Sequence, residues 1–304
     1  DSTGASGYLD DVWKFNPTTT EWTWIAGSST QGAARVFGTI NVEASANTPG
    51  AREWGATWVH SDGNLYLFGG SFPGLYQWQG DFWRLNSSTG EWAHIGQQVG
   101  TSGGGSFGVK GVSSPTNYPG RRYAGAYWTD PSGNFWLMGG EGNGENGSDN
   151  YLNDMWKYDP VVHEWTYMTG GRNGGQALPG VKLSSDPLNT PGQTTVPSWT
   201  SDSAGNFYLI AGWGRASSGG EQNLNMLYRF NTTSGEWTWL AGTDGGGMQP
   251  NWGVMGTSGA SNSIGWREGG GMWISLSGEL WYYGGRSLDE TSSLGSMIDF
   301  WRFF

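Results

Sequence analysis

The sequence predicts an all-β protein built from one repeated unit. A unit of about 72 residues recurs four times in register, and repetition at a fixed period indicates stacked copies of one small structural element. No stretch shows sustained 3.6-residue periodicity, and the 55 glycines are too dense for long helices. We therefore expect one domain over residues 1–304. Four dipeptides mark the repeat: Gly69-Gly70, Gly139-Gly140, Ala211-Gly212 and Gly284-Gly285.

Each marker dipeptide closes an apolar, aromatic run, which predicts a buried strand. We expect each strand to end there because the backbone turns to positive φ, a conformation that glycine adopts without a steric penalty. The predicted strands cover residues 65–68, 135–138, 207–210 and 280–283.

A second aromatic run follows each marker after a loop, and the chain holds five copies of it. Its central aromatics, each followed by Lys or Arg, are Trp13, Trp83, Trp156, Tyr228 and Trp301. Nine positions after the first four of them stands the Trp of a Glu-Trp pair, at Trp22, Trp92, Trp165 and Trp237. This constant spacing predicts a hairpin whose turn contains residues that favour turn backbones. The turns lie at Asn16-Pro17, Asn86-Ser87, Asp159-Pro160 and Asn231-Thr232.

The long connection from each predicted hairpin to the next strand that ends in a marker dipeptide is also periodic. Gly38, Gly108, Gly180 and Gly253 each stand nine residues before an Asn, and 22 residues separate each Asn from the next marker. We therefore predict ordered loops, because a disordered linker would not keep this register. The variable segment is the loop that follows each marker.

Composition narrows the possible partners. The net charge is −11 and the pI is about 4.6, so nucleic acid and anionic membrane surfaces are poor partners. No apolar run approaches 18 residues, which argues against membrane insertion. The absence of cysteine excludes disulfides and thiol catalysis. The chain begins at Asp1, in what is elsewhere the loop before a third strand, which predicts a processed or truncated product.

Three glycosylation sequons occur, at Asn86, Asn146 and Asn231, and two of them fall at predicted hairpin tips. Together with low charge and high glycine and aromatic content, they favour an extracellular or cell-surface protein, with occupancy of the sequons left open.

These features resemble the kelch repeat, in which a Gly-Gly pair follows the second of four strands and aromatics occupy the third and fourth. The clearest copy is Asn-Asp-Met-Trp-Lys-Tyr-Asp-Pro at 153–160 with Glu164-Trp165, and the likeness covers essentially the whole chain. An Asn-x-Pro-Gly-x-Arg segment before the first strand, as at 47–52 and 117–122, is similar to a long-repeat variety. The resemblance implies an all-β, kelch-type β-propeller of four-stranded antiparallel blades around a central channel.

The chain departs from the usual kelch repeat in its longer unit and in its strand tally. We count four copies of the first, second and fourth strands and five of the third, in units of about 8–25 (partial), 38–95, 108–168, 180–240 and 253–304. The terminal strands therefore either complete one blade or pair with another chain. The spare third strand is also explained if the chain is a piece of a larger propeller.

Residues that break the repeat are the best candidates for function, because propellers carry function on loops. In the loops after the second strands, aromatic rings are suited to stack on sugar faces or on a protein partner, and polar groups to bind hydroxyls. The alternative is that these rings only cover a neighbouring blade or a subunit contact. The candidates are Phe72, Tyr76, Trp78, Glu145, Asn146, Asp149, Trp213, Arg215, Arg286 and Asp289.

The loop that contains Glu141, Asn143, Glu145 and Asp149 supplies oxygen ligands suited to calcium. It lacks the ordered alternation of an EF-hand, so an ordinary solvated loop is the favoured interpretation. The three histidines are not spaced as zinc or copper ligands. We predict no cofactor.

The Glu residues of the Glu-Trp pairs are predicted to be structural and not catalytic, because an active-site pair need occur only once. We expect each to pair with Lys or Arg of the adjacent strand. Galactose oxidase-like chemistry is excluded, since it needs a cysteine-linked tyrosine. The sequence thus predicts a non-enzymatic protein- or glycan-binding or structural module. The alternatives are a self-assembling extracellular subunit that exchanges terminal strands, and a carbohydrate-active enzyme.

Overall fold

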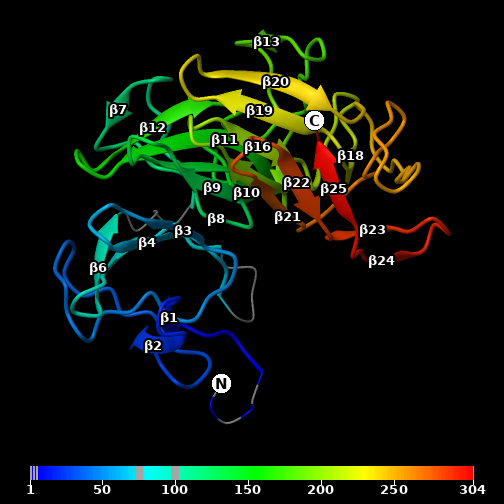
Figure 1. Cartoon of the computed structure of the whole chain (residues 1–304). Coiled ribbons are helices and arrows are strands. Elements are labelled where there is room, and N and C mark those ends of the chain that lie inside the picture. Colours follow the sequence, from blue (N-terminus) through cyan, green and yellow to red (C-terminus); the bar gives the residue numbers. More distant parts are fainter. Residues whose placement is uncertain (1, 3, 5, 73–77, 97–102, 304) are drawn as a thin grey trace.

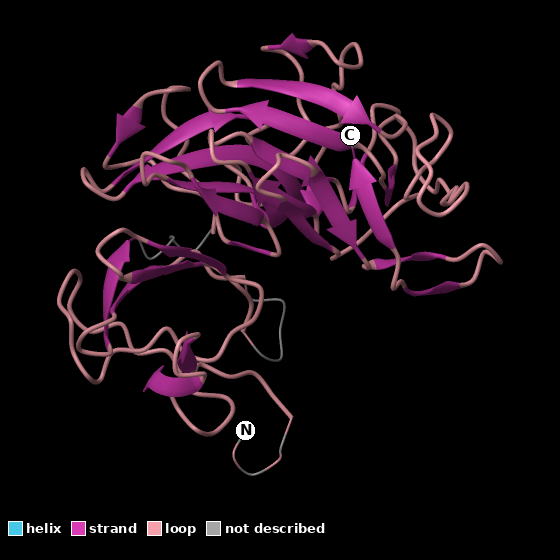
Figure 2. Ribbon diagram, in the orientation of Figure 1, coloured by secondary structure: helices cyan, strands magenta, loops and turns pink. Residues whose placement is uncertain are grey.

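The computed structural model describes residues 2, 4, 6–72, 78–96 and 103–303. These residues form strands, turns and loops but no helix (Figure 2). The described part of the chain accordingly contains no helix that is long and apolar enough to span a membrane. The predicted all-β fold is confirmed.

Three antiparallel sheets of four, six and five strands form the centre of the molecule, and each contains a blade of four strands in sequence order. Blade 1 contains β3 (Ala56–Val59), β4 (Leu65–Phe68), β5 (Phe82–Asn86) and β6 (Glu91–Gly96). Blade 2 contains β9 (Ala126–Thr129), β10 (Phe135–Asn143), β11 (Asp149–Asp159) and β12 (Glu164–Thr169). Blade 3 contains β15 (Ser198–Ser201), β16 (Phe207–Ile210), β19 (Leu227–Asn231) and β20 (Glu236–Ala241).

Smaller sheets lie at the two ends of the chain. The N-terminal hairpin contains β1 (Val12–Asn16) and β2 (Glu21–Ala26), and blade 4 contains β21 (Gly271–Ile274), β22 (Leu280–Tyr283) and β25 (Phe300–Phe303). The first strands of successive blades lie against one another. The blades therefore follow an arc, with the N-terminal hairpin at one end and blade 4 at the other (Figure 1). This arrangement is propeller-like, and the predicted strand tally is confirmed.

The terminal strands stay apart in the structure. β2 pairs with β1 in a register that runs from Asn16↔Glu21 to Val12↔Ala26, and Val12 and Ile25 pack on the core of blade 1. No described strand pairing joins β2 to β25. The expected completion of one blade by both termini is therefore not observed, because β1 already occupies the edge of β2 that a third strand would take.

The variable loops after the second strands of blades 2, 3 and 4 contain short ladders. Beyond its kink at Gly139-Gly140, β10 continues to pair with β11 and also with β8 (Arg122–Tyr123). Equivalent ladders in the later blades contain β14 (Thr194–Thr195), β17 (Trp213–Arg215), β18 (Glu221–Asn223), β23 (Arg286–Leu288) and β24 (Leu294–Ser296). Two further short strands, β7 (Ser113–Ser114) and β13 (Ser185–Asp186), extend the outer edges of blades 2 and 3.

The aromatic residues of the repeat pack between neighbouring blades. Phe82 of blade 1 contacts Tyr158 and Trp165 of blade 2, with ring centroids 4.8 and 5.5 Å apart. Trp128 of blade 2 stacks on Phe207 of blade 3 at 3.8 Å. Aromatic contacts of this kind add to the free energy gained from burial. The repeated Trp residues of blades 1 to 3 therefore belong to the cores between neighbouring sheets.

The long periodic loops are ordered, as predicted. Four isolated bridges recur at equivalent positions: Val36↔Thr48, Ser106↔Tyr118, Leu178↔Thr190 and Asn251↔Ser263.

The Gly-to-Asn spacing within these loops has a local cause. In blade 2, Asn117 donates from Nδ2 to the carbonyls of Val112 and Trp165 at 2.9 and 3.1 Å. Gly108 has φ of 57°, and a Cβ there would lie 2.3 Å from the Asn117 Oδ1. Only glycine fits beside this amide.

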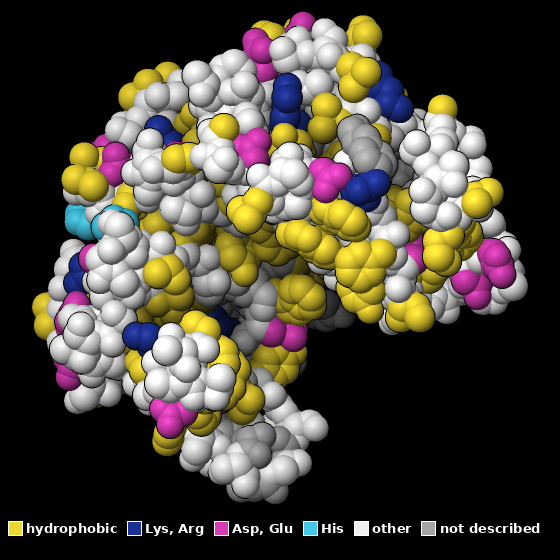
Figure 3. Space-filling view, viewed as in Figure 1, with side chains coloured by type: hydrophobic (Ala, Val, Ile, Leu, Met, Phe, Trp, Pro, Cys, Tyr) yellow, Lys and Arg dark blue, Asp and Glu magenta, His cyan; other side chains and the backbone are white. Residues whose placement is uncertain are grey.

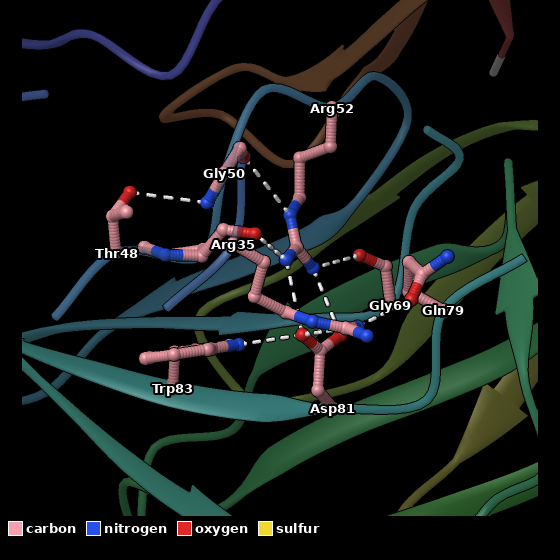
Figure 4. A network of polar contacts seen from close by, with 9 residues as sticks. Arg35, Thr48, Gly50, Arg52, Gly69, Gln79, Asp81 and Trp83 are labelled. Atoms are coloured by element: carbon pink, nitrogen blue, oxygen red, sulfur yellow. Dashed lines mark hydrogen bonds and ion pairs between the residues drawn. The ribbon is translucent and has the colours of Figure 1, made fainter. Parts of the chain in front are cut away.

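In blades 1, 2 and 4, buried ion pairs fix the loop before the first strand to the start of the third strand. In blade 1, the Asp81 carboxylate binds Arg52 at 3.0 Å, accepts a hydrogen bond from Trp83 Nε1 at 2.8 Å and pairs with Arg35 (Figure 4). Arg122–Asp154 and Arg267–Asp299 repeat the pair in blades 2 and 4.

The Glu residues of the Glu-Trp pairs do not make the ion pairs that we expected. Among the described residues none of these carboxylates pairs with Lys or Arg of the adjacent strand, and Arg84 instead binds Glu43 at 3.0 Å. The repeated arginines that matter for the frame are those before the first strand.

Candidate functional site

Side chains from three successive blades gather where the short ladders begin. Tyr123 of β8 donates a hydrogen bond from its hydroxyl to Glu141 Oε2 of β10 at 2.8 Å. Its ring stacks on Trp78, with centroids 6.3 Å apart and an interplanar angle of 11°. Trp78 is held by a bridge to Ser71 and is buried. One predicted aromatic thus supports a half-buried tyrosine that sequence reasoning missed.

Tyr151 continues this group toward blade 3. Glu141 lies opposite Tyr151 across the β10–β11 ladder. The pKa of Tyr151 is raised by burial and by the negative charges of Glu141 and Glu221, while a hydrogen bond with Trp213 opposes the shift. The half-buried Trp213, a predicted candidate, therefore lies next to Tyr151.

Tyr8 extends the group toward the N-terminus by a hydrogen bond from its hydroxyl to Glu53 Oε1 at 3.2 Å, which raises its pKa. Burial is the first cause that raises the pKa of Tyr123, followed by its bond to Glu141 and by the charges of Tyr151 and Glu53. We call this set the aromatic rim: Tyr8, Glu53, Trp78, Tyr123, Glu141, Tyr151, Trp213 and Glu221.

The sequence did contain a signal for the missed residues. One repeat position is Arg in three repeats and Thr in the fourth, and the residue that follows it differs between repeats. These following residues are Glu53, Tyr123, Thr195 and Glu268. The side chain at this following position faces the ladder after the second strand, where Glu53↔Ser71, Glu141↔Tyr123 and Thr195↔Trp213 pair.

Several predicted candidates make local contacts away from the rim's rings. Arg215 pairs with Glu221 at 3.2 Å and Arg286 with Glu268 at 3.3 Å. Asp289 accepts turn hydrogen bonds from Thr291 and Ser293.

Two further predicted candidates, Phe72 and Tyr76, belong to the loop after β4. Phe72 lies beside two cations, with its ring 5.1 Å from the Arg35 guanidinium carbon and 5.2 Å from that of Arg52. Tyr76 lies outside the described residues.

The calcium hypothesis gains no support from geometry, since its four side chains bind other protein groups or one another. Glu141 binds Tyr123, and Glu145 pairs with Arg172 at 2.5 Å. Asn143 directs its amide, not its oxygen, to Asp149 at 2.7 Å. Within the described ranges, no three acidic or histidine side chains are placed to hold a metal ion.

The sequons differ in the freedom of the Asn amide. Asn86 is half-buried and donates from Nδ2 to Glu43 Oε2 at 3.0 Å. Asn146 is exposed and Asn231 is half-buried, and the Oδ1 atoms of both accept turn hydrogen bonds.

A cavity with a volume of about 1310 Å³ lies beside blade 4. It is lined by β25, by residues 252–260 and by Leu227 and Ala241 of blade 3. In blades 1, 2 and 3, a fourth strand pairs with the outer edge of the third strand, whereas the corresponding edge of β25 has no described partner strand. Asn262 reflects the difference: its Nδ2 donates to the Thr257 carbonyl, whereas Asn47, Asn117 and Asn189 also reach a fourth-strand Trp carbonyl.

Comparison with known proteins bears on the fold. No protein-family model and no curated protein matches the chain. Among solved structures, the chain is similar to the one described as "Structure of YjhT", with a TM-score of 0.57 and 15% sequence identity over 97% of this chain and 76% of that chain. At this identity the similarity supports the all-β, propeller-like fold.

Proposed function

We propose that this chain is an extracellular, non-enzymatic kelch-type propeller module that binds a glycan through the aromatic rim. The proposal rests chiefly on one observation: half-buried rings from successive blades lie next to carboxylates at one end of the blades. Stacked rings suit the apolar faces of sugars, and carboxylate oxygens accept hydrogen bonds from sugar hydroxyls.

The charges of the rim narrow the class of glycan. Glu53, Glu141 and Glu221 belong to it, while the nearby Arg215 is already paired with Glu221. The whole chain carries a net charge of −11. A neutral or amino sugar fits this potential, whereas a sulfated or carboxylated glycan would be repelled.

A glycan array with the unmodified chain tests the proposal, followed by titration of the best hit. Trp213→Ala and Tyr151→Ala should each weaken binding at least tenfold, because each removes a stacking surface. Trp239→Ala is the matched control, since Trp239 is a half-buried ring on β20, 5.2 Å from Lys182 Nζ, and belongs to neither the rim nor the end faces of the arc. Binding that survives both rim substitutions, or an array without hits, would contradict the proposal. Capture of a protein through the same two residues would assign the rim to a protein partner.

A second candidate function is self-assembly by terminal strand exchange, favoured by the cavity beside β25. The strand β2 has the sequence Glu-Trp-Thr-Trp-Ile-Ala, almost that of the fourth strand β20, Glu-Trp-Thr-Trp-Leu-Ala. A second copy's β2 would therefore suit the open edge of β25.

Because the chain lacks cysteine, engineered pairs test this directly. Pairing of β25 as in blade 1 would set Arg302 opposite Thr23, as Arg84 lies opposite Ala93. An intermolecular disulfide in Arg302→Cys/Thr23→Cys supports exchange. In the control Lys14→Cys/Thr23→Cys, a disulfide within one chain reports the pairing of the structure, Lys14↔Thr23. If only the control pair closes, exchange does not occur.

A further inference from the structure

Both ends of the arc present aromatic faces to solvent. The N-terminal end face consists of one side of the β1–β2 hairpin, and the C-terminal end face of one side of blade 4. Figure 3 shows hydrophobic side chains over both regions. The exposed fractions are 51% for Trp13, 44% for Phe15, 65% for Trp22, 49% for Trp24, 38% for Trp273, 41% for Tyr283 and 60% for Phe300.

The equivalent side chains inside the arc are buried. Phe15 pairs with Trp22 across the hairpin as Tyr158 pairs with Trp165 in blade 2, and the latter two residues are 3% and 6% exposed. Phe300 pairs with Tyr283 as Phe82 pairs with Phe68 in blade 1, and the latter two are 3% and 2% exposed. The end faces are thus standard interblade surfaces without a described neighbour.

The interior of the chain shows which face covers which. At the interface between blades 1 and 2, Phe82 lies 4.8 Å from Tyr158 and 5.5 Å from Trp165, and Phe68 lies 5.7 Å from Trp165. In these contacts, the side of blade 1 that is equivalent to the C-terminal end face packs on the side of blade 2 that is equivalent to the N-terminal end face. The same pairing of faces builds the cores between blades 2 and 3 and between blades 3 and 4.

We propose that the C-terminal end face of one copy packs on the N-terminal end face of a second copy. The contact would place Phe300 against Phe15 and Trp22, as Phe82 lies against Tyr158 and Trp165. A second copy is the fitting occupant because it carries both complementary faces, while the two ends of one copy lie apart (Figure 1). Neither hairpin β1–β2 nor blade 4 needs to break a strand pairing. The contact is heterologous, so it repeats from copy to copy.

This proposal is independent of glycan binding and makes a specific mixing prediction. Trp22→Asp leaves only the C-terminal face active, and Phe300→Asp leaves only the N-terminal face active. Each variant alone should be monomeric in light scattering coupled to size exclusion, at the 32.8 kDa of one chain. Mixed in equal amounts, they should form a species of twice that mass and nothing larger. The unmodified chain should form larger, concentration-dependent species.

The controls separate folding from assembly. Val161→Asp changes a residue that is 78% exposed and lies on neither end face, so it should assemble like the unmodified chain. Circular dichroism must show equal strand content in all variants. A dimer of either single variant alone would overturn the head-to-tail contact, because it would mean that like faces pair. A monomeric unmodified chain at all concentrations would also overturn it, whether the chain closes on itself or binds another partner.

Discussion

The guanidinium of Arg122 binds the carboxylate of Asp154 at two points, with N–O distances of 2.7 and 2.8 Å, and neither side chain has appreciable contact with solvent. Asp154 also accepts a hydrogen bond from Trp156 Nε1 at 2.7 Å. A pair of this kind balances its desolvation cost only while both partners are present. In blade 3 the equivalent positions hold Thr194 and Met226, both fully buried, so the fold also accepts a neutral arrangement.

Asp154→Ala should lower the free energy of unfolding by about 3–5 kcal/mol, because it leaves the Arg122 charge buried and unpaired. Chemical denaturation measures this loss. Glu164→Gln is the control within the same blade, and it should change stability by less than about 0.5 kcal/mol because its carboxylate holds no ion pair. Equal losses in the two variants would contradict the structural role assigned to the arginine pairs.

Acid should destabilise the protein through Asp81. Burial alone would raise the pKa of this carboxyl, but the charges and hydrogen bonds of Arg52, together with Trp83 and Arg35, hold the pKa below its ordinary value. A lowered folded-state pKa stabilises the protein above the unfolded value, about 4, and this contribution is lost as the pH falls through the folded value. Denaturant titrations between pH 6 and pH 2 should show it, and Asp81→Asn should flatten the pH dependence in this window. An unchanged slope in the variant would refute it.

The repeated Asn residues should differ in their contribution to stability. Asn117→Ala removes two hydrogen bonds to buried carbonyls and should cost about 1–3 kcal/mol. Asn262→Ala removes a bond in an exposed setting and should cost less than half as much. Thermal unfolding of the two variants makes the comparison, and equal losses would count against the structural difference between blades 2 and 4.

Occupancy of the sequons should follow the freedom of the Asn amide. Expression in a glycosylating host should give high occupancy at Asn146 and Asn231 and low occupancy at Asn86, where Glu43 binds the acceptor nitrogen at 3.0 Å. Peptide mass mapping measures each site. Glu43→Ala should raise occupancy at Asn86 and leave Asn146 unchanged. Full occupancy of Asn86 in the unmodified chain would contradict the mechanism.

The repeat made the frame of this protein predictable from sequence. Strand identity, hairpin turns and the ordered loops all follow from spacings that recur, such as the step from Gly108 to Asn117. Positive φ was predicted correctly at Gly69-Gly70, Gly139-Gly140 and Gly284-Gly285. It does not occur at Ala211-Gly212, where the chain instead passes into the β14–β17 ladder.

The candidate site was only partly predictable, because it depends on contacts between blades. Trp78 and Trp213 were found because they break the repeat. Tyr123 was missed although it occupies a repeat position whose residue differs between repeats, and Tyr151 gave no comparable signal, since its significance comes from Glu141 and from neighbours in another repeat. The Arg122–Asp154 pair was missed for the same reason: its partners lie 32 residues apart, and short-range spacing does not reveal which strand a loop will meet.

The placement of each hydrophobic core between two blades, and not within one, has a consequence for the dynamics of the chain. Blades 2 and 3 are supported on both sides, whereas the N-terminal hairpin and blade 4 are each supported on one side only. In a single, unassembled chain, opening of this quasi-linear array should therefore begin at the ends and move inward. Amide protons of β11 and β19 should therefore exchange with solvent deuterium most slowly, and those of β1 and β25 fastest, giving a protection gradient that follows position along the arc.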